Sequence, residues 1–153
     1  MPEVRLDLRH PQRQLVEVSV SFLPRRYPVA LSLPGWTPGS YLIRDYVRTL
    51  EDLRAFSGDR PLVLERTGAA SWRLDDPGDA GAEPGPVTLR YRILATELTV
   101  RTCHLTSDHG FLALAGVVLQ VDGERWSPHR LDLLLPPGWE PFLPLTRHDD
   151  GHW

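Results

Sequence analysis

Lysine and asparagine are missing from this chain of 153 residues, so arginine supplies all 17 of its basic side chains. Without lysine, the chain cannot form a Schiff base through an ε-amine or hold a nucleotide phosphate with a P-loop lysine. The arginines are scattered along the sequence and are balanced by 20 acidic residues, which leaves a formal net charge of −3. We therefore expect no basic surface for nucleic acid.

Cysteine and long hydrophobic runs are also scarce. Cys103 is the single cysteine, which excludes an intramolecular disulfide and a cysteine-based zinc knuckle. The longest uncharged apolar run, Phe111–Val121, is too short to span a bilayer. The N-terminal segment alternates charged and apolar residues and contains no hydrophobic core of a secretory signal. The sequence thus predicts no membrane partner and leaves the cellular compartment open.

Short segments of alternating apolar and polar residues dominate the chain, and this period of two is typical of half-buried strands. The 15 prolines and 12 glycines suit many turns and disfavour long helices. The sequence therefore predicts an all-β fold, an antiparallel β-sandwich of short strands with long Pro/Gly-rich loops and little helix. We expect the strands at Val4–Leu8, Leu15–Phe22, Val29–Leu33, Leu62–Arg66, Ser71–Leu74, Val87–Ile93, Leu98–Leu105, Phe111–Val121 and Leu131–Leu135.

Three further segments are less regular. In Tyr46–Phe56 the apolar residues recur every three positions, which suits a helical turn or two. The segment lies among predicted strands, however, and we therefore predict a strand. Asp75–Pro86 is rich in glycine, proline and acids and predicts a loop. Asp122-Gly123 is a hairpin-turn signal.

Domain organisation follows from these segments. Residues 1–140 are expected to form one N-terminal β-sandwich domain, because the length suits a single buried core. Residues 141–153 hold prolines, histidines and two adjacent aspartates, and the last residue is a tryptophan. We interpret this stretch as a linker that leads towards a domain outside this chain.

Three groups of residues mimic catalytic sites, and the physics of each argues against catalysis. His148–His152 has the spacing of a zincin motif, but that motif needs a helix and Gly151 lies within the stretch. Cys103 and His104 are neighbours on a predicted strand, so their side chains point to opposite faces. Ser107–His109 has consecutive residues, which cannot form the geometry of a catalytic triad. We predict no catalytic residue and no metal ligand in this chain.

The most constrained stretch of the sequence is Pro34–Arg48. Its two prolines fix φ, and the glycines that follow them supply the freedom that a Pro-Gly turn demands. Large aromatic and charged side chains follow. They suit contact with a neighbouring domain or with a peptide substrate, since arginine can bind carboxylates and tyrosine suits interfaces. The alternative is a structural ion-pair network. The candidate contact residues are Trp36, Tyr41, Arg44, Asp45, Tyr46 and Arg48.

The run Trp36-Thr37-Pro38-Gly39-Ser40-Tyr41, continued by Ile43-Arg44-Asp45-Tyr46, resembles a segment of the N-terminal domain of the M61 family of zinc aminopeptidases. These are glycyl aminopeptidase-like enzymes that usually carry a PDZ domain. Weaker similarities extend over nearly the whole chain. They lie in Gly58, Leu62 and Trp72, in Val87–Arg92 and in Leu135–Trp139.

The resemblance implies a non-catalytic β-domain that packs on the catalytic domain of the same polypeptide and shapes the entrance for a peptide substrate. It also implies that zinc, its His-Glu-x-x-His ligands and the PDZ domain belong to parts outside this chain, so this chain needs no cofactor and is inactive alone. Two alternatives stay open. One is a free-standing β-sandwich that binds peptide or carbohydrate through Trp36, Tyr41 or Trp126, and the other is an enzyme in its own right.

Overall fold

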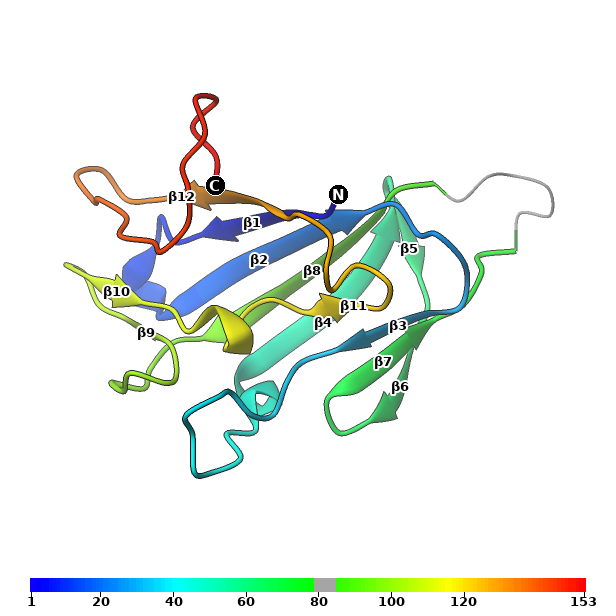
Figure 1. Ribbon diagram of the computed structural model, residues 1–153, viewed down its shortest axis with the longest axis horizontal. Coiled ribbons are helices and arrows are strands. Elements are labelled where there is room, and N and C mark those ends of the chain that lie inside the picture. Colours follow the sequence, from blue (N-terminus) through cyan, green and yellow to red (C-terminus); the bar gives the residue numbers. More distant parts are fainter. Residues whose placement is uncertain (79–84) are drawn as a thin grey trace.

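We describe a computed structural model of the chain, in which residues 1–78 and 85–153 are described (Figure 1). The fold is nearly all β, as predicted, and its two larger sheets enclose one hydrophobic core. The six-stranded sheet has the order β12-β1-β2-β8-β4-β5, the four-stranded sheet the order β11-β3-β7-β6, and β9 pairs with β10. The strands are β1 (Glu3–Asp7), β2 (Leu15–Phe22), β3 (Val29–Ser32), β4 (Leu50–Ser57), β5 (Arg60–Leu62), β6 (Leu64–Gly68), β7 (Ser71–Leu74), β8 (Val87–Leu94), β9 (His104–Leu105), β10 (Gly110–Phe111), β11 (Gln120–Val121) and β12 (Arg130–Leu134). Three short 3₁₀ turns are η1 (Pro11–Arg13), η2 (Tyr46–Thr49) and η3 (Leu114–Gly116).

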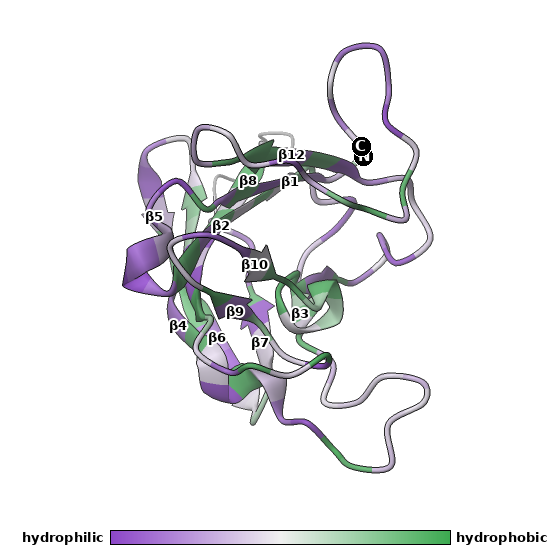
Figure 2. Ribbon diagram, turned by 90° about the vertical axis from the view of Figure 1, so that its left-hand side faces the viewer, coloured by the Kyte–Doolittle hydropathy of each residue, from purple (hydrophilic) through white to green (hydrophobic). Residues whose placement is uncertain are grey.

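Strict alternation in β2 and β8 builds the centre of the larger sheet. Val18 of β2 lies opposite Tyr91 of β8, and all of the inward positions of both strands are buried. The outward positions are polar apart from Leu15 and Leu94 at one end of the pair, so one face of the sheet forms the core and the other faces solvent. Leu31 and Trp72 of the four-stranded sheet are buried in the same core cluster. Figure 2 shows the hydropathy of each element around this core.

The strand pairs are antiparallel, with one exception among the described residues. β1 runs parallel to β12, with Leu6 opposite Leu133, and antiparallel to β2 on its other side. The first and the last strand of the fold are therefore neighbours (Figure 1). The predicted antiparallel sandwich therefore includes one parallel pair.

The apolar segment Phe111–Val121 is not the continuous strand that we predicted. It contains the end of β10, then η3, then β11. Val117 and Leu119 are buried, but the Tyr91 hydroxyl binds this backbone in place of a neighbouring strand. The turn at Asp122-Gly123 forms, with Gly123 at φ 82°, yet no hairpin follows because the next strand, β12, pairs with β1.

Other boundaries also differ from the prediction. Tyr46–Phe56 divides into η2 and β4, so both interpretations of its spacing hold in part. Only the last two residues of Leu98–Leu105 form a strand, β9. Leu62–Arg66 is shared between β5 and β6, which belong to different sheets. Of the predicted loop Asp75–Pro86, residues 75–78 and 85–86 carry no strand, and residues 79–84 lie outside the described residues.

The segment 141–153 returns to the edge of the six-stranded sheet. The backbone amide of Leu131 donates to the Trp153 carbonyl (2.7 Å), and the Trp153 amide donates to the Leu131 carbonyl (3.1 Å). Leu143 and Trp153 pack against the core, and the Arg147 guanidinium lies over the Trp153 ring. None of the described helical segments is long and apolar enough to cross a membrane.

Candidate functional site

The loop of residues 34–48 follows β3, ends within η2 and is closed by its own backbone. The amide of Arg44 donates to the carbonyl of Gly35 (2.7 Å), which brings the two ends of the tip together. Within the tip, the Ser40 amide donates to the Thr37 carbonyl (3.1 Å) across Pro38-Gly39. Gly39 has φ 84°, a conformation that favours glycine. The Pro-Gly chemistry in the sequence thus produces a tight, hydrogen-bonded tip.

Ser40 is buried beneath this tip and organises it. Its hydroxyl donates to the Leu42 carbonyl (2.7 Å) and accepts from the Arg44 Nε (3.2 Å). The Trp36 indole N–H donates to the Ser40 carbonyl (2.7 Å). Of the candidate residues, Trp36 and Arg44 are therefore held in place by the serine between them.

Tyr46 is buried and anchors the loop from below. Its ring packs on Gly116 of η3, where a Cβ would lie 2.7 Å from the Tyr46 Cδ1. Its hydroxyl lies 3.3 Å from that of Thr37. The Tyr46 ring can come this close to η3 only because residue 116 is a glycine. The packing of the loop on η3 therefore depends on Gly116.

Arg48 fastens the loop to a second one, residues 97–103. Its guanidinium forms an ion pair with the Glu97 carboxylate, with Nη2 donating to Oε2 at 2.7 Å. This hydrogen bond lowers the pKa of Glu97 and raises that of Arg48. Within the second loop, Thr99 and Thr102 bond through their hydroxyls at 2.6 Å. Arg48 is thus part of an ion pair within this chain, which is the alternative role considered for the charged residues of this loop.

Asp45 begins η2 in a left-handed conformation, with φ 49° and ψ 54°. Its backbone carbonyl accepts from the Arg48 amide, but its side chain makes no capping hydrogen bond. Asp45 is exposed and therefore presents its carboxylate to solvent at the base of the loop.

Six large apolar side chains remain exposed on the two loops, and we call them the loop-end surface. Tyr41 is 98% exposed, Ile43 81% and Leu98 79%. The other members are Trp36, Leu42 and Val100. The first loop is the lowest part of the molecule in Figures 1 and 2, and Figure 2 shows its hydrophobic tip in green. Between the loops lies a cavity of about 320 Å³ whose lining includes Pro38, Tyr46, Val100 and Arg101.

Four members of this surface were missed by the sequence interpretation: Leu42, Ile43, Leu98 and Val100. Leu42 and Ile43 follow Tyr41 directly, and three consecutive apolar residues beside a Pro-Gly turn were the available signal. Leu98 and Val100 were assigned to a strand that does not form, and no local pattern marked them as exposed.

The residues that mimic catalytic sites do not assemble one. Burial raises the pKa of the Cys103 thiol to about 11, so it stays protonated at neutral pH. Asp108 and His109 are in contact at 3.0 Å, but they also bond to Thr106 on an exposed turn. His148–His152 forms a hairpin-like turn, with the His148 amide donating to the His152 carbonyl. In the described part of the chain, no three histidine, cysteine or acidic side chains come together as metal ligands.

The chain matches the family model described as the peptidase M61 N-terminal domain over residues 3–153. It is also similar to the crystal structure of an aminopeptidase N family protein from Idiomarina loihiensis, with a TM-score of 0.81 and 30% sequence identity. That likeness covers 90% of this chain but 22% of the other, so the chain spans less than a quarter of that protein. No curated protein sequence matches the chain.

Proposed function

Because this chain belongs to the peptidase M61 N-terminal domain family, we propose that it packs on the catalytic domain of a zinc aminopeptidase and shapes the entrance for the peptide substrate. The family match confirms the resemblance carried by Trp36–Tyr46. In this proposal zinc is bound by the catalytic domain of the same polypeptide, which also precedes a PDZ domain. This chain supplies support and surface, and no step of the hydrolysis.

The loop-end surface is the observation that carries the docking proposal. A soluble domain seldom leaves many large apolar side chains exposed on two neighbouring loops, and exposed apolar surface of this kind marks interaction sites. The loops that bear them are braced by Tyr46 and by the Arg48–Glu97 pair, so little ordering is needed on contact. Arg44 and Asp45 lie beside the apolar tip, where they suit the polar rim of an interface or the ends of a peptide.

The experiment tests association of this chain with the separately expressed remainder of its polypeptide. Ile43→Asp replaces an exposed apolar side chain at the tip and should weaken association by about tenfold or more, since burying an isoleucine contributes about 1.5–3 kcal/mol. Val63→Asp is the matched control, because Val63 is 86% exposed between β5 and β6, outside the loop-end surface. Peptidase activity is measured in the same samples.

Two results would contradict the proposal. Equal association of the two variants would remove the loop-end surface from the interface. Failure of the unsubstituted chain to associate at all would argue against interdomain packing. A separate variant, Arg44→Gln, tests the substrate side of the entrance. If it leaves association between the two parts unchanged but alters the KM for peptide, the Arg44 side chain contacts the substrate.

The free-standing binding module gains no support from the cavities around its expected aromatic residues. Neither Trp36 nor Tyr41 lines the cavity beside the loop, and Trp126 lies exposed with Arg125 over its ring. We therefore favour the docking function.

A further inference from the structure

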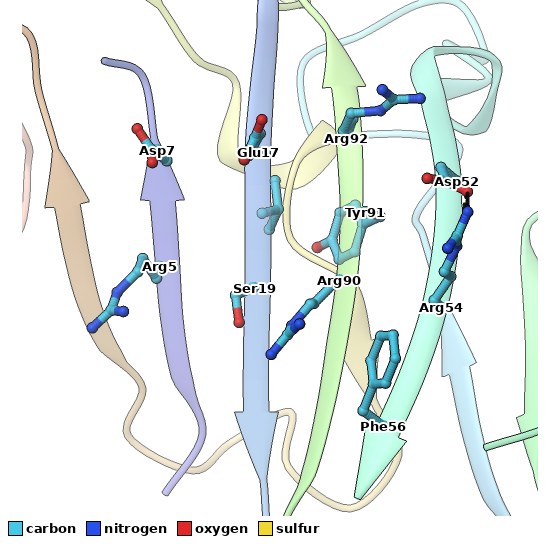
Figure 3. Close-up of a pocket in the computed structure, with 11 residues that line it drawn as sticks. Arg5, Asp7, Glu17, Ser19, Asp52, Arg54, Phe56, Arg90, Tyr91 and Arg92 are labelled. Carbon is cyan, nitrogen blue, oxygen red and sulfur yellow. Dashed lines mark hydrogen bonds and ion pairs between the residues drawn. The ribbon is translucent and has the colours of Figure 1, made fainter. Parts of the chain in front are cut away.

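The solvent face of the six-stranded sheet carries a second feature, independent of the loop-end surface. A hollow of about 430 Å³ lies over β1, β2, β8 and β4 (Figure 3). Its polar lining includes Arg5, Ser19, Arg54, Arg90 and Arg92. The side chains stand on the outward positions of the strands, which the core does not use. The hollow is therefore built on rigid elements and not on loops.

Three of the four arginines in this hollow already form an ion pair with a carboxylate. The pairs are Arg5–Asp132 at 2.9 Å, Arg54–Asp52 at 2.8 Å and Arg92–Glu51 at 3.5 Å. In Figure 3 the side chains of Arg5 and Arg92 turn outwards from the centre of the hollow, and Arg54 turns along β4 to Asp52. Their charges are therefore largely compensated within the face.

Arg90 is the exception. Among the described residues no carboxylate lies within ion-pair distance of its guanidinium, whose recorded contact is with the Phe56 ring, 4.9 Å from the centroid. In the register of the sheet Arg90 lies between Ser19 of β2 and Arg54 of β4. Like charges directly opposite each other on neighbouring strands are destabilising. Asp52 offsets the charge of Arg54, whereas Arg90 has the Phe56 ring as its contact and no ion-pair partner among the described carboxylates.

We propose that the hollow at Arg90 binds a carboxylate. A guanidinium presents N–H donors in a planar fork that matches the two oxygens of a carboxylate, and stacking on Phe56 leaves the edge of that fork available. Ser19, on the strand towards which Arg90 reaches in Figure 3, supplies a hydroxyl donor. The bound carboxylate would offset the charge of Arg90, which no described carboxylate pairs with.

The surrounding acids select for a singly charged anion. Asp7, Glu17 and Asp52 also line the hollow, and their negative charges disfavour a phosphate dianion. The carboxylate can come from a free organic acid or from an acidic side chain of a polypeptide, and the experiment distinguishes these sources.

The first arm titrates acetate into the ¹⁵N-labelled chain at constant ionic strength, so that general salt screening stays fixed. We expect saturable shifts of the Arg90 Nε–H signal and of the Ser19 amide. Arg90→Gln should weaken the Ser19 response by about tenfold or more, because it removes the charge and the fork. Arg90→Lys keeps the charge and should weaken it by a smaller factor. Arg13→Gln is the matched control, because it makes the same charge change at an exposed arginine that does not line the hollow, and its response should stay within about twofold.

The second arm uses a blocked peptide with a single glutamate and its glutamine counterpart. Binding of the glutamate peptide at least as tightly as acetate assigns the site to a polypeptide side chain, whereas binding of acetate alone assigns it to a free organic acid. The proposal is overturned if Arg90 and Ser19 do not respond to either carboxylate. It is also overturned if Arg90→Gln behaves like Arg13→Gln, or if inorganic phosphate binds more tightly than acetate. None of these readouts depends on the loop-end surface, so the site can fail while the docking proposal stands.

Discussion

Replacement of Tyr91 by phenylalanine isolates one hydroxyl that joins the two layers of the fold. The hydroxyl donates to the Val117 carbonyl (2.8 Å) and accepts from the Leu119 amide (3.0 Å). Tyr91 is 3% exposed, and both partner residues are buried. Burial raises the pKa of Tyr91 well above its ordinary value, so the hydroxyl keeps its proton over the accessible pH range.

The loss can be estimated from the two backbone groups left without a partner. A buried donor or acceptor without a partner costs about 1–3 kcal/mol. The Val117 carbonyl and the Leu119 amide together should cost about 3 kcal/mol in free energy of unfolding. For a domain of this length, that corresponds to a fall in Tm of about 6–12 °C. The loss should be the same at about pH 6 and about pH 9, because the hydroxyl does not titrate between them.

Urea unfolding followed by tryptophan fluorescence measures the effect as a shift in midpoint at constant m. Tyr41→Phe is the control, since Tyr41 is 98% exposed, and its free energy of unfolding should stay within about 0.5 kcal/mol of the parent. If Tyr91→Phe were as stable as this control, the hydroxyl would not hold the segment around Val117, and our account of why that segment is not a strand would be refuted.

Three further substitutions test the braces described above. Gly116→Ala places a methyl group 2.7 Å from the Tyr46 Cδ1 and should cost about 1–3 kcal/mol in urea unfolding; an unchanged midpoint would show that the ring moves freely. Arg48→Gln should return the lowered pKa of Glu97 towards its ordinary value in an NMR titration. Because the folded-state pKa is lowered, the pair stabilises the fold above the ordinary carboxyl pKa, and this contribution is lost as pH falls through the folded value. Trp153→Ala removes a half-buried indole packed on the core and should cost about 1–2 kcal/mol by thermal unfolding; equal Tm values would argue that the C-terminal segment adds no stability.

The strands that could be predicted are those whose pattern has one interpretation. β2 was predicted at its observed bounds because it alternates over its whole length, and its inward positions are the buried ones. Phe111–Val121 was predicted wrongly because an apolar run without alternation does not distinguish a strand from other buried backbone. The contact that decides its path, to Tyr91, comes from a residue 26 positions away. Nothing local to the segment records it.

The candidate site was predictable to the extent that turn chemistry is local. The Pro-Gly pairs, Trp36 and Tyr41 marked the loop and two of its exposed side chains. The roles of Tyr46 and Arg48 could not be separated from the others in sequence, because each is set by a distant partner, Gly116 in one case and Glu97 in the other. Nothing in the sequence distinguishes Arg90 from the other arginines. Its distinction is that none of the described carboxylates forms an ion pair with it, which depends on sheet register.

The parallel pairing of β1 with β12 constrains the order in which this domain can mature on the ribosome. Arg5 and Asp132, which are 127 positions apart, must meet before the larger sheet is complete. During synthesis, the backbone hydrogen-bonding groups on one edge of β1 therefore have no partner strand while most of the domain is still being translated. The nascent chain should depend on chaperone protection until the last strand emerges, and a message truncated upstream of β12 should yield an aggregation-prone product.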